Sequence, residues 1–243
     1  MRDYQQETIA RVAFIKQLLK ESGAKGIVFG NSGGKDSALV GILCKMACDN
    51  TVGVILPCAS KRNYGADADD GRELAEQFGI ECRVVDLTPV REALLGSLQG
   101  VTEPNAQALT NIAPRLRMTT LYAIGASEGL LVAGTGNRSE RFVGYFTKWG
   151  DGGTDFNPIA DLNVTEVYEF LRYLNAPASI IEKAPSAGLF DGQTDEEDMG
   201  VSYAQIDAYM DGNAVPEDKK AIIERMHRIS EHKRRGVRFF VEE

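Results

Sequence analysis

The segment 30–37 reads GNSGGKDS and holds glycines, hydroxyls, a lysine and a carboxylate within one short stretch. Gly33 and Gly34 can adopt backbone angles that other residues avoid, so successive N–H groups can point into one concavity that binds an anion. An apolar run precedes the segment and a helical pattern follows it, which puts the anion at the positive end of a helix dipole. With the hydroxyls of Ser32 and Ser37 as further donors, the pattern predicts a phosphate site for a nucleotide.

Two common glycine motifs do not fit this spacing. A Walker loop needs Ser or Thr directly after its lysine, whereas Lys35 is followed by Asp36, and a dinucleotide fingerprint needs G-x-G-x-x-G. The string SGGxDS resembles the pyrophosphatase loop of the N-type ATP pyrophosphatases, which cleave ATP between the α and β phosphates. The alternative is a plain glycine turn in which Asp36 and Ser37 only cap a helix.

Composition narrows the class of protein. The 243 residues carry a formal net charge of −8, with 43% hydrophobic and 26% charged residues, as expected for a globular protein. The acidic balance argues against a nucleic-acid binder, because phosphate backbones are held by clustered Lys and Arg. No apolar stretch reaches the roughly 20 residues of a membrane helix and the N-terminus lacks a signal-peptide layout, so we expect a cytoplasmic protein without a membrane partner.

Cysteine and histidine give no sign of a metal centre. The four cysteines form no CxxC pair, and Cys44 and Cys48 are expected to be small buried hydrophobes on one helix face. Both histidines, His227 and His232, fall in the last helical segment. A histidine-based metal site or catalytic triad is therefore not supported.

Strand and helix patterns alternate along the chain, which predicts an α/β fold with a parallel sheet and right-handed crossovers. The expected strands span 24–29, 51–56, 81–87 and 130–133, and the expected helices span 4–20, 38–48, 65–78, 89–98, 111–127, 163–174, 202–210 and 216–235. Pro114 is expected near the first turn of its helix. The acidic run 186–200 is predicted to be a mobile surface loop, and with no repeat or linker we treat 1–243 as one domain.

Ligands of an open parallel sheet lie beyond the carboxyl ends of the strands, where the strand order reverses. The segment 30–37 and the string GTGNRSE at 134–140 both follow a strand. If those two strands are adjacent, Asp36 and Glu140 converge on one site. Mg²⁺ suits such a site, because it takes one or two carboxylates together with phosphate oxygens and water.

Further strings extend the resemblance from about residue 25 to 235. NIAPRLRM, GTGNRSE, GYFTKWGDGGTDFNPIADL, KAPSAGLFDGQTDEEDMG, SYAQIDAYM and EHKR occur in the order seen in ammonia-dependent NAD synthetases. The resemblance implies one doubly wound parallel sheet flanked by helices, of the adenine nucleotide alpha hydrolase-like kind. It also implies that ATP adenylates the nicotinate carboxylate of deamido-NAD, that pyrophosphate leaves, and that ammonia then displaces AMP to give NAD.

The resemblance assigns residues position by position. It gives ATP binding to Gly30, Asn31, Ser32, Gly33, Gly34, Lys35, Asp36, Ser37, Thr135 and Ser186, and Mg²⁺ binding to Asp36 and Glu140. It gives deamido-NAD binding to Arg115, Lys148, Asp155, His232 and Lys233. We expect Asp36, Lys148 and Asp155 to serve catalysis, with Asp155 a candidate proton acceptor on residue type alone.

One position departs from the family. Many members carry an ATP-contacting lysine where this chain has Val164, and Lys183 or Lys35 would have to supply that charge. The family is a homodimer with deamido-NAD at the subunit boundary, and a chain of this length leaves no room for an amidase domain, so free ammonia is the expected nitrogen donor. Another ATP pyrophosphatase, such as a GMP synthetase-like amidating subunit, and a catalytically silent nucleotide-binding protein are the alternatives.

Overall fold

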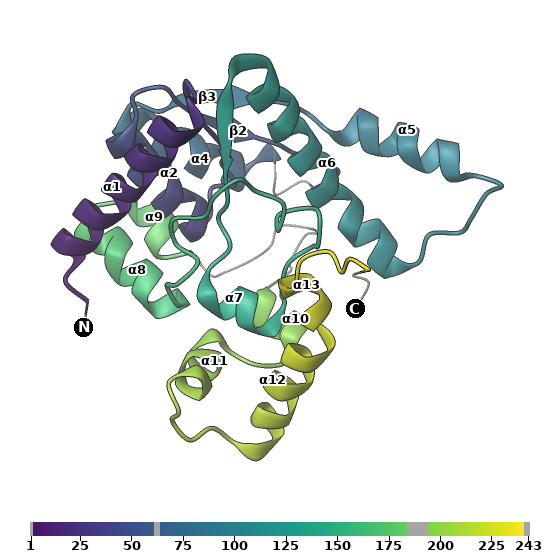
Figure 1. Ribbon diagram of the computed structural model, residues 1–243. Helices are drawn as coiled ribbons and strands as arrows, with labels where there is room; N and C mark the ends of the chain where they lie inside the picture. The colour runs from purple at the N-terminus through teal and green to yellow at the C-terminus, as the bar shows by residue number, and fades with distance from the viewer. Residues whose placement is uncertain (1, 61–63, 184–193, 241–243) are drawn as a thin grey trace.

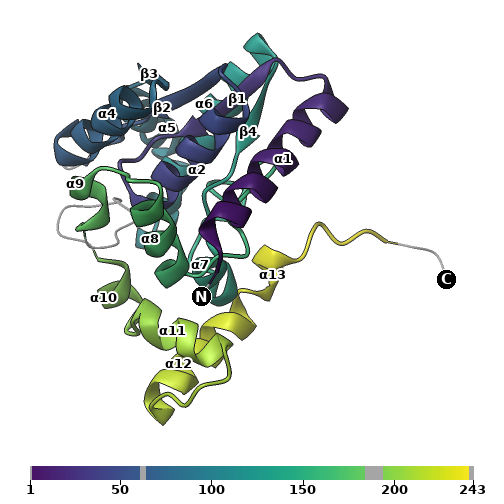
Figure 2. The same cartoon turned by 90° about the vertical axis from the view of Figure 1, so that its left-hand side faces the viewer.

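A computed structural model describes residues 2–60, 64–183 and 194–240 of the chain. Four parallel strands form one sheet in the order β3-β2-β1-β4, and helices cover both of its faces (Figures 1 and 2). The strands are β1 (Gly26–Gly30), β2 (Thr51–Ile55), β3 (Glu81–Val84) and β4 (Leu130–Ala133). The α/β class and the parallel sheet predicted from the sequence are confirmed.

Helices connect and surround the strands. They are α1 (Tyr4–Ser22), α2 (Lys35–Ala47), α4 (Ala66–Phe78), α5 (Thr88–Leu98), α6 (Ala106–Glu128), α7 (Arg138–Val143), α8 (Val164–Tyr173), α9 (Ala178–Ile181), α10 (Asp195–Met199), α11 (Tyr203–Met210), α12 (Glu217–Ile229) and α13 (Glu231–Arg234). None of the helices within the described ranges combines the length and apolar character needed to span a membrane.

Alternate residues of β1 point to opposite faces, and each face has its own core. Ile27 and Phe29 pack with α1, α2, α4, α8 and α9, whereas Val28 packs with β2, β4 and α6. β1 is buried on both sides, as a central parallel strand must be. A third apolar cluster joins α7 to α10, α11 and α12 beyond the carboxyl ends of the strands (Figure 1).

The strand order reverses at β1. Going forward from β1, the chain winds through α2, β2, α4 and β3 on one side, and α6 then brings β4 to the other side of β1. The register pairs Val28 with Val132, so the segments that follow β1 and β4 leave the sheet side by side. The sequence predicted that Asp36 and Glu140 would converge if these two strands were adjacent, and the strands are adjacent.

Several expectations need correction. α6 begins at Ala106, so Pro114 lies well inside it, where it cannot donate the usual hydrogen bond to the carbonyl of Thr110. Pro114 is buried and lies next to Gly150, a tertiary contact that a local pattern does not reveal. The segment 195–199 of the predicted mobile loop is helix α10, capped by Thr194, while 186–193 lies outside the described residues. The last helix is broken at Ser230 into α12 and α13.

The capping signals were read correctly. Asn163 and Glu166 form a capping box that opens α8, and Ser202 and Gln205 form another that opens α11. α2 starts three residues earlier than expected, so Lys35 and Asp36 belong to its first turn.

Close packing of α2 on β1 gives the first prediction. A Cβ on Gly41 would stand 2.6 Å from Phe29 Cζ, whereas a Cβ on Gly96 of α5 would meet nothing within 4 Å. We expect Gly41→Ala to lower the free energy of unfolding by about 1–3 kcal/mol through overpacking. The control Gly96→Ala should raise it by roughly 0.5–1 kcal/mol, because alanine loses less chain entropy in a helix. Urea unfolding measures both, and changes of the same sign would contradict the packing argument.

Candidate functional site

The turn between β1 and α2 has the geometry of an anion cradle. Gly33 has a φ of 69°, and a Cβ there would lie 2.1 Å from the carbonyl oxygen of Asp67, so only glycine fits. Gly34 is the N-cap of α2 and has no side chain, so no N-cap side chain accepts a hydrogen bond from the first N–H groups of that helix. The hydroxyls of Ser32 and Ser37 lie 3.0 Å apart within the turn. The arrangement suits a phosphate at a helix N-terminus.

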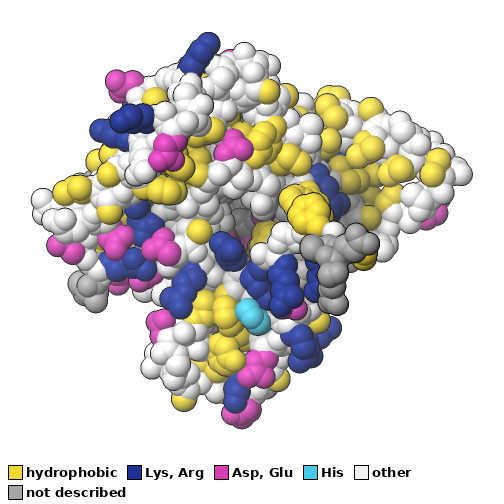
Figure 3. Space-filling model, in the orientation of Figure 1, with side chains coloured by type: hydrophobic (Ala, Val, Ile, Leu, Met, Phe, Trp, Pro, Cys, Tyr) yellow, Lys and Arg dark blue, Asp and Glu magenta, His cyan; other side chains and the backbone are white. Residues whose placement is uncertain are grey.

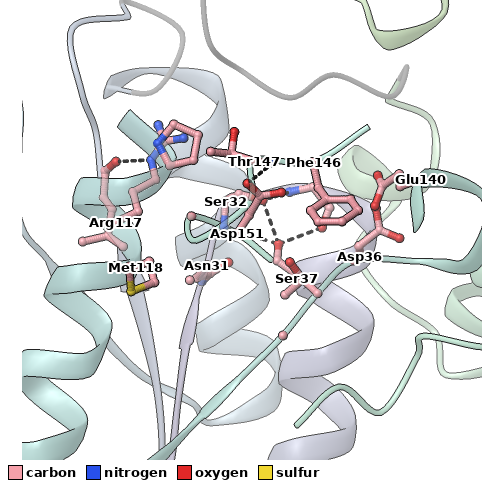
Figure 4. A pocket seen from close by; sticks show the side chains of 18 of the residues that line it. Asn31, Ser32, Asp36, Ser37, Arg117, Met118, Glu140, Phe146, Thr147 and Asp151 are labelled. Carbon is pink, nitrogen blue, oxygen red and sulfur yellow. Dashed lines mark hydrogen bonds between the residues drawn. The ribbon is translucent and has the colours of Figure 1, made fainter. Parts of the chain in front are cut away.

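Asp36 and Glu140 lie together beside this turn (Figure 4), and Asn137 hydrogen-bonds to both of them. Asn137 Nδ2 donates to Asp36 Oδ1 at 3.1 Å, and the backbone N–H of Asn137 donates to Glu140 Oε2 at 3.1 Å. Asn137 is fully buried and caps α7 through a capping box with Glu140. Burial and the neighbouring Asp36 raise the pKa of Glu140 well above its ordinary value, while Lys35 acts in the opposite direction.

Lys35 is a cation that lies beside this pair. Its Nζ lies 2.7 Å from Asp36 Oδ2 and 4.0 Å from Glu140 Oε1, and it stands 5.4 Å from the ring centroid of Tyr203. Burial alone would lower the pKa of Lys35, but the carboxylates of Asp36 and Glu140 raise it above its ordinary value. The ammonium therefore stays charged inside the protein.

A cavity of about 580 Å³ extends from the turn across the carboxyl ends of β1, β2 and β4. This volume is in the range of sites for small ligands. Part of its wall is apolar, formed by Val54, Leu56, Met118, Leu121 and Val132. The opposite part is polar and includes the turn, Glu140 and the loop after α7 (Figure 4).

A second carboxylate region lies at the loop 144–154. Asp151 lines the cavity, and its Oδ1 accepts a hydrogen bond from the backbone N–H of Thr147 at 2.9 Å. The residue as a whole is exposed, yet burial of its carboxylate within the cavity raises the pKa of Asp151. Lys233 and Arg117 also line the cavity, and burial lowers the pKa of each.

Lys183 is one of two lysines expected to supply the charge of the lysine that this chain lacks at position 164, but its ammonium is already paired with two carboxylates. Its Nζ lies 2.6 Å from Asp67 Oδ1 and 2.6 Å from Asp70 Oδ2, at the start of α4 and the edge of the cavity. Val164 itself is 5% exposed and packs in the third apolar cluster. The stem of a lysine at this position would therefore begin among apolar side chains.

Most of the predicted ATP and metal residues line one cavity. They are Gly30, Asn31, Ser32, Gly34, Lys35, Asp36, Ser37, Thr135 and Glu140, and Lys233 from the deamido-NAD set joins them. Gly33 backs the turn against Asp67, and Ser186 lies outside the described residues. The roles given to these residues remain predictions.

Four predicted residues do not line that cavity. The carboxylate of Asp155 accepts hydrogen bonds from the Tyr122 hydroxyl at 2.9 Å and the Val132 N–H at 2.8 Å, at the edge of the sheet. The other three form a chain on the surface beside the cavity. Arg115 Nη2 lies 3.4 Å from the carbonyl oxygen of Lys148, and Lys148 Nζ donates to the carbonyl oxygen of His232 at 2.7 Å. Figure 3 shows Lys and Arg side chains gathered around this hollow, next to a histidine.

Sequence reasoning missed three residues of the site: Asn137, Arg117 and Asp151. A signal existed for Asn137, because Asn followed by Glu three positions later is a capping-box pattern. No local signal distinguishes Asp151 from a solvated charge in a glycine-rich loop. Arg117 and Arg115 lie two positions apart on α6, and only the packing of the helix directs Arg117 into the cavity.

The residues at the cavity fit a magnesium ion bound with a nucleotide. In the described ranges, no cluster of three or more Asp, Glu, His or Cys side chains is arranged to hold a metal by itself. The pair Asp36 and Glu140 matches the one or two carboxylates that Mg²⁺ uses when phosphate oxygens and water complete its shell. Burial and, after it, the neighbouring Asp36 carboxylate raise the pKa of Glu140, and a divalent cation would favour the ionised form.

Known proteins resemble this chain over almost its whole length. An NH(3)-dependent NAD(+) synthetase of Carboxydothermus hydrogenoformans is 46% identical over 239 residues, with 96% of each chain covered. The structure of an NMN synthetase from Francisella tularensis matches with a TM-score of 0.93 and 37% identity over 98% of this chain and 99% of that one. An NH3-dependent NAD synthetase from Campylobacter jejuni matches with a TM-score of 0.80 and 27% identity over 99% and 100%.

These matches confirm the predicted adenine nucleotide alpha hydrolase-like fold. The NAD synthase family model covers residues 7–237. The chain therefore belongs to the NAD synthase family, an enzyme family whose members include relatives named NH(3)-dependent NAD(+) synthetase.

Proposed function

We propose that this protein uses ATP and ammonia to amidate the nicotinate carboxylate of deamido-NAD, giving NAD, AMP and pyrophosphate. The observation that carries the proposal is the convergence of the glycine turn and the Asp36–Glu140 pair on one cavity at the carboxyl end of the sheet. The chain's membership of the NAD synthase family supports the choice of substrates.

ATP fits this cavity with its phosphates at the turn and its adenine in the apolar part. The N–H groups at the start of α2 and the hydroxyls of Ser32 and Ser37 would bind the phosphates. Mg²⁺, held by Asp36 and Glu140, would neutralise charge on the phosphates as pyrophosphate leaves. The substrate carboxylate attacks the α-phosphorus, the bond to the β-phosphate oxygen breaks, and an acyl-adenylate forms.

Ammonia then attacks the acyl carbon, the bond to AMP breaks, and one proton must leave the nitrogen. Asp151 is a better acceptor for that proton than Asp155, because Asp151 lines the cavity whereas both oxygens of Asp155 are used at the sheet edge. A base with a raised pKa is well matched to this task near neutral pH. Lys233 is half-buried, and its charge, which interacts with Asp151, would hold the substrate or AMP.

The exposed residues of the deamido-NAD set suit a site completed by a second copy of the chain. Arg115, Lys148 and His232 lie together beside the cavity, and Asp155 lies on the outer side of β4. Helix α5 buries none of its residues and projects with the first half of α6 away from the sheet (Figure 1). We propose a homodimer in which these surfaces contact the dinucleotide.

A second candidate substrate is nicotinate mononucleotide. The specific observation in its favour is the 0.93 TM-score to a structure named NMN synthetase, against 0.80 for a structure named NH3-dependent NAD synthetase. The acyl chemistry at the nicotinate carboxylate is the same for both acceptors. Only the surface that would hold the AMP half of deamido-NAD distinguishes them.

A pyrophosphate-release assay tests the proposal. The protein is incubated with ATP, Mg²⁺ and ammonia, together with deamido-NAD, nicotinate mononucleotide, XMP or no acceptor. We expect deamido-NAD to give the highest kcat/KM and NAD to accumulate in equal amount with pyrophosphate. Preference for nicotinate mononucleotide would establish the second candidate, preference for XMP a different amidating enzyme, and tight ATP binding without turnover a silent nucleotide-binding protein.

Replacing the carboxylate of Asp36 tests its metal role. Asp36→Asn removes one charge that would hold Mg²⁺, so we expect kcat to fall by about 10²–10³ while circular dichroism stays unchanged. Asp49→Asn, at a fully exposed carboxylate after the same helix, is the matched control and should keep the parent rate. A parent rate in Asp36→Asn would remove the metal role.

Two glycines with the same backbone angle separate strain from phosphate binding. Gly33 has φ 69° and a blocked Cβ position, whereas Gly79 has φ 63° and open space around it. Alanine at either position should lose roughly 1–2 kcal/mol of stability from the left-handed conformation, and Gly33→Ala should lose more because its Cβ would meet the carbonyl oxygen of Asp67. Only Gly33→Ala should also lower the affinity for ATP, by about tenfold or more. Calorimetry with a non-hydrolysable ATP analogue and Mg²⁺ measures this affinity. Equal ATP affinities in the two variants would refute the cradle.

The raised pKa of Asp151 predicts a pH dependence. The ionised carboxylate is the active form, so the rate per free ammonia should fall as pH drops through a pKa above the ordinary range of Asp. Asp151→Asn should lose about 10²–10⁴ in kcat and lose this acidic limb. Asp155→Asn should keep the limb. A limb that persists in Asp151→Asn and disappears in Asp155→Asn would transfer the role to Asp155.

A further inference from the structure

Lys35 occupies an unusual position for a lysine. It is 7% exposed, and its ammonium lies between the two carboxylates that the proposed function assigns to Mg²⁺. The third group in contact with it is the ring of Tyr203 from α11, at 5.4 Å from the centroid. A lysine in a phosphate turn commonly serves as a point charge toward phosphate. Here the charge is directed at carboxylates instead.

The surroundings of Lys35 fix its direction. Asp36 Oδ1 and Glu140 Oε2 are held by Asn137, which leaves Asp36 Oδ2 and Glu140 Oε1 facing Lys35 Nζ. Tyr203 is 2% exposed, and its hydroxyl donates to Asp195 Oδ2 at 2.9 Å. The aromatic ring thus closes the site on the side of α11, and its face attracts the cation.

Two carboxylates held this close repel one another, and in a buried site one of them must protonate or gain a cation. Lys35 supplies one positive charge, so the pair remains metal-ready in the protein without nucleotide. The same ammonium occupies the space between the carboxylates. A free Mg²⁺ ion entering there would bring two further positive charges next to Lys35.

We propose that Lys35 is a built-in counter-cation that reserves the Asp36–Glu140 pair, so that Mg²⁺ enters only together with ATP, whose phosphate oxygens take over the Lys35 ammonium. This inference rests on the proposed function in assigning the metal to that pair. The triphosphate supplies the negative charge that allows the ammonium and the metal ion to coexist. Metal and nucleotide therefore bind cooperatively, and Lys35 is the residue that couples them.

The test measures metal binding without catalysis. Thermal unfolding of the full chain is followed as Mg²⁺ is added, with no nucleotide or with α,β-methylene ATP. The parent protein should respond to Mg²⁺ only with the nucleotide analogue. Lys35→Met should melt roughly 10 °C lower without metal, because it leaves the buried carboxylates unpaired, and Mg²⁺ alone should restore its stability. Without nucleotide, its half-saturating Mg²⁺ concentration should be about tenfold or more below the highest Mg²⁺ concentration at which the parent shows no response.

Two further variants keep the inference falsifiable. Lys45→Met, on the same helix, is the matched control and should behave as the parent, because the Lys45 ammonium only donates to the carbonyl oxygen of Asp49 at 2.9 Å and lies 3.8 Å from its exposed carboxylate. If Lys35→Met does not fold, Lys35→Met combined with Glu140→Gln removes the repulsion and should fold without metal. The inference fails if Mg²⁺ alone stabilises the parent as well as Lys35→Met, or if the double variant is no more stable than Lys35→Met. The parent's NAD formation, assayed separately, shows whether the proposed function itself holds.

Discussion

The site depends on the parallel pairing of β1 with β4. This pairing sets the segments 30–37 and 134–140 next to each other at the point where the strand order reverses. Asn137 then joins the two segments by donating to Asp36, a residue 101 positions away along the chain. Because Asn137 is fully buried and also caps α7, the position of Glu140 relative to Asp36 is fixed by the fold and not by a flexible loop.

Buried charge is the second feature that organises this region. Lys35 contacts Asp36 and lies 4.0 Å from Glu140, and Tyr203 and Asp195 connect this group to α11 and α10. Such a group is costly unless each charge has a partner. The C-terminal helices thereby take part in the electrostatics of a site whose anion cradle comes from the first strand and helix. Asp151 lies in a different part of the cavity, where burial changes its pKa without a like charge.

The pattern of the sequence predicted the elements well where a local rule applied. The capping boxes at Asn163 and Ser202, the left-handed C-cap at Gly79 and the four strands all depend on neighbours within a few residues. Pro114 was placed wrongly because α6 begins at Ala106, before the expected start at residue 111. Asp151 and Arg117 were missed for another reason: whether a charged side chain faces a cavity is set by elements distant in sequence.

By itself, the order of residues determined the glycine turn, the alternation of strand and helix, and the chemical types gathered at 30–37 and 134–140, because these follow from backbone freedom and hydrophobic period. Only the tertiary structure decided that Lys35 faces two carboxylates, that Asp155 is engaged by Tyr122 and the edge of β4, and that Asp151 lines the cavity. The physical reason is that burial, and the charge partners which burial requires, are properties of the packed chain and of no short segment within it.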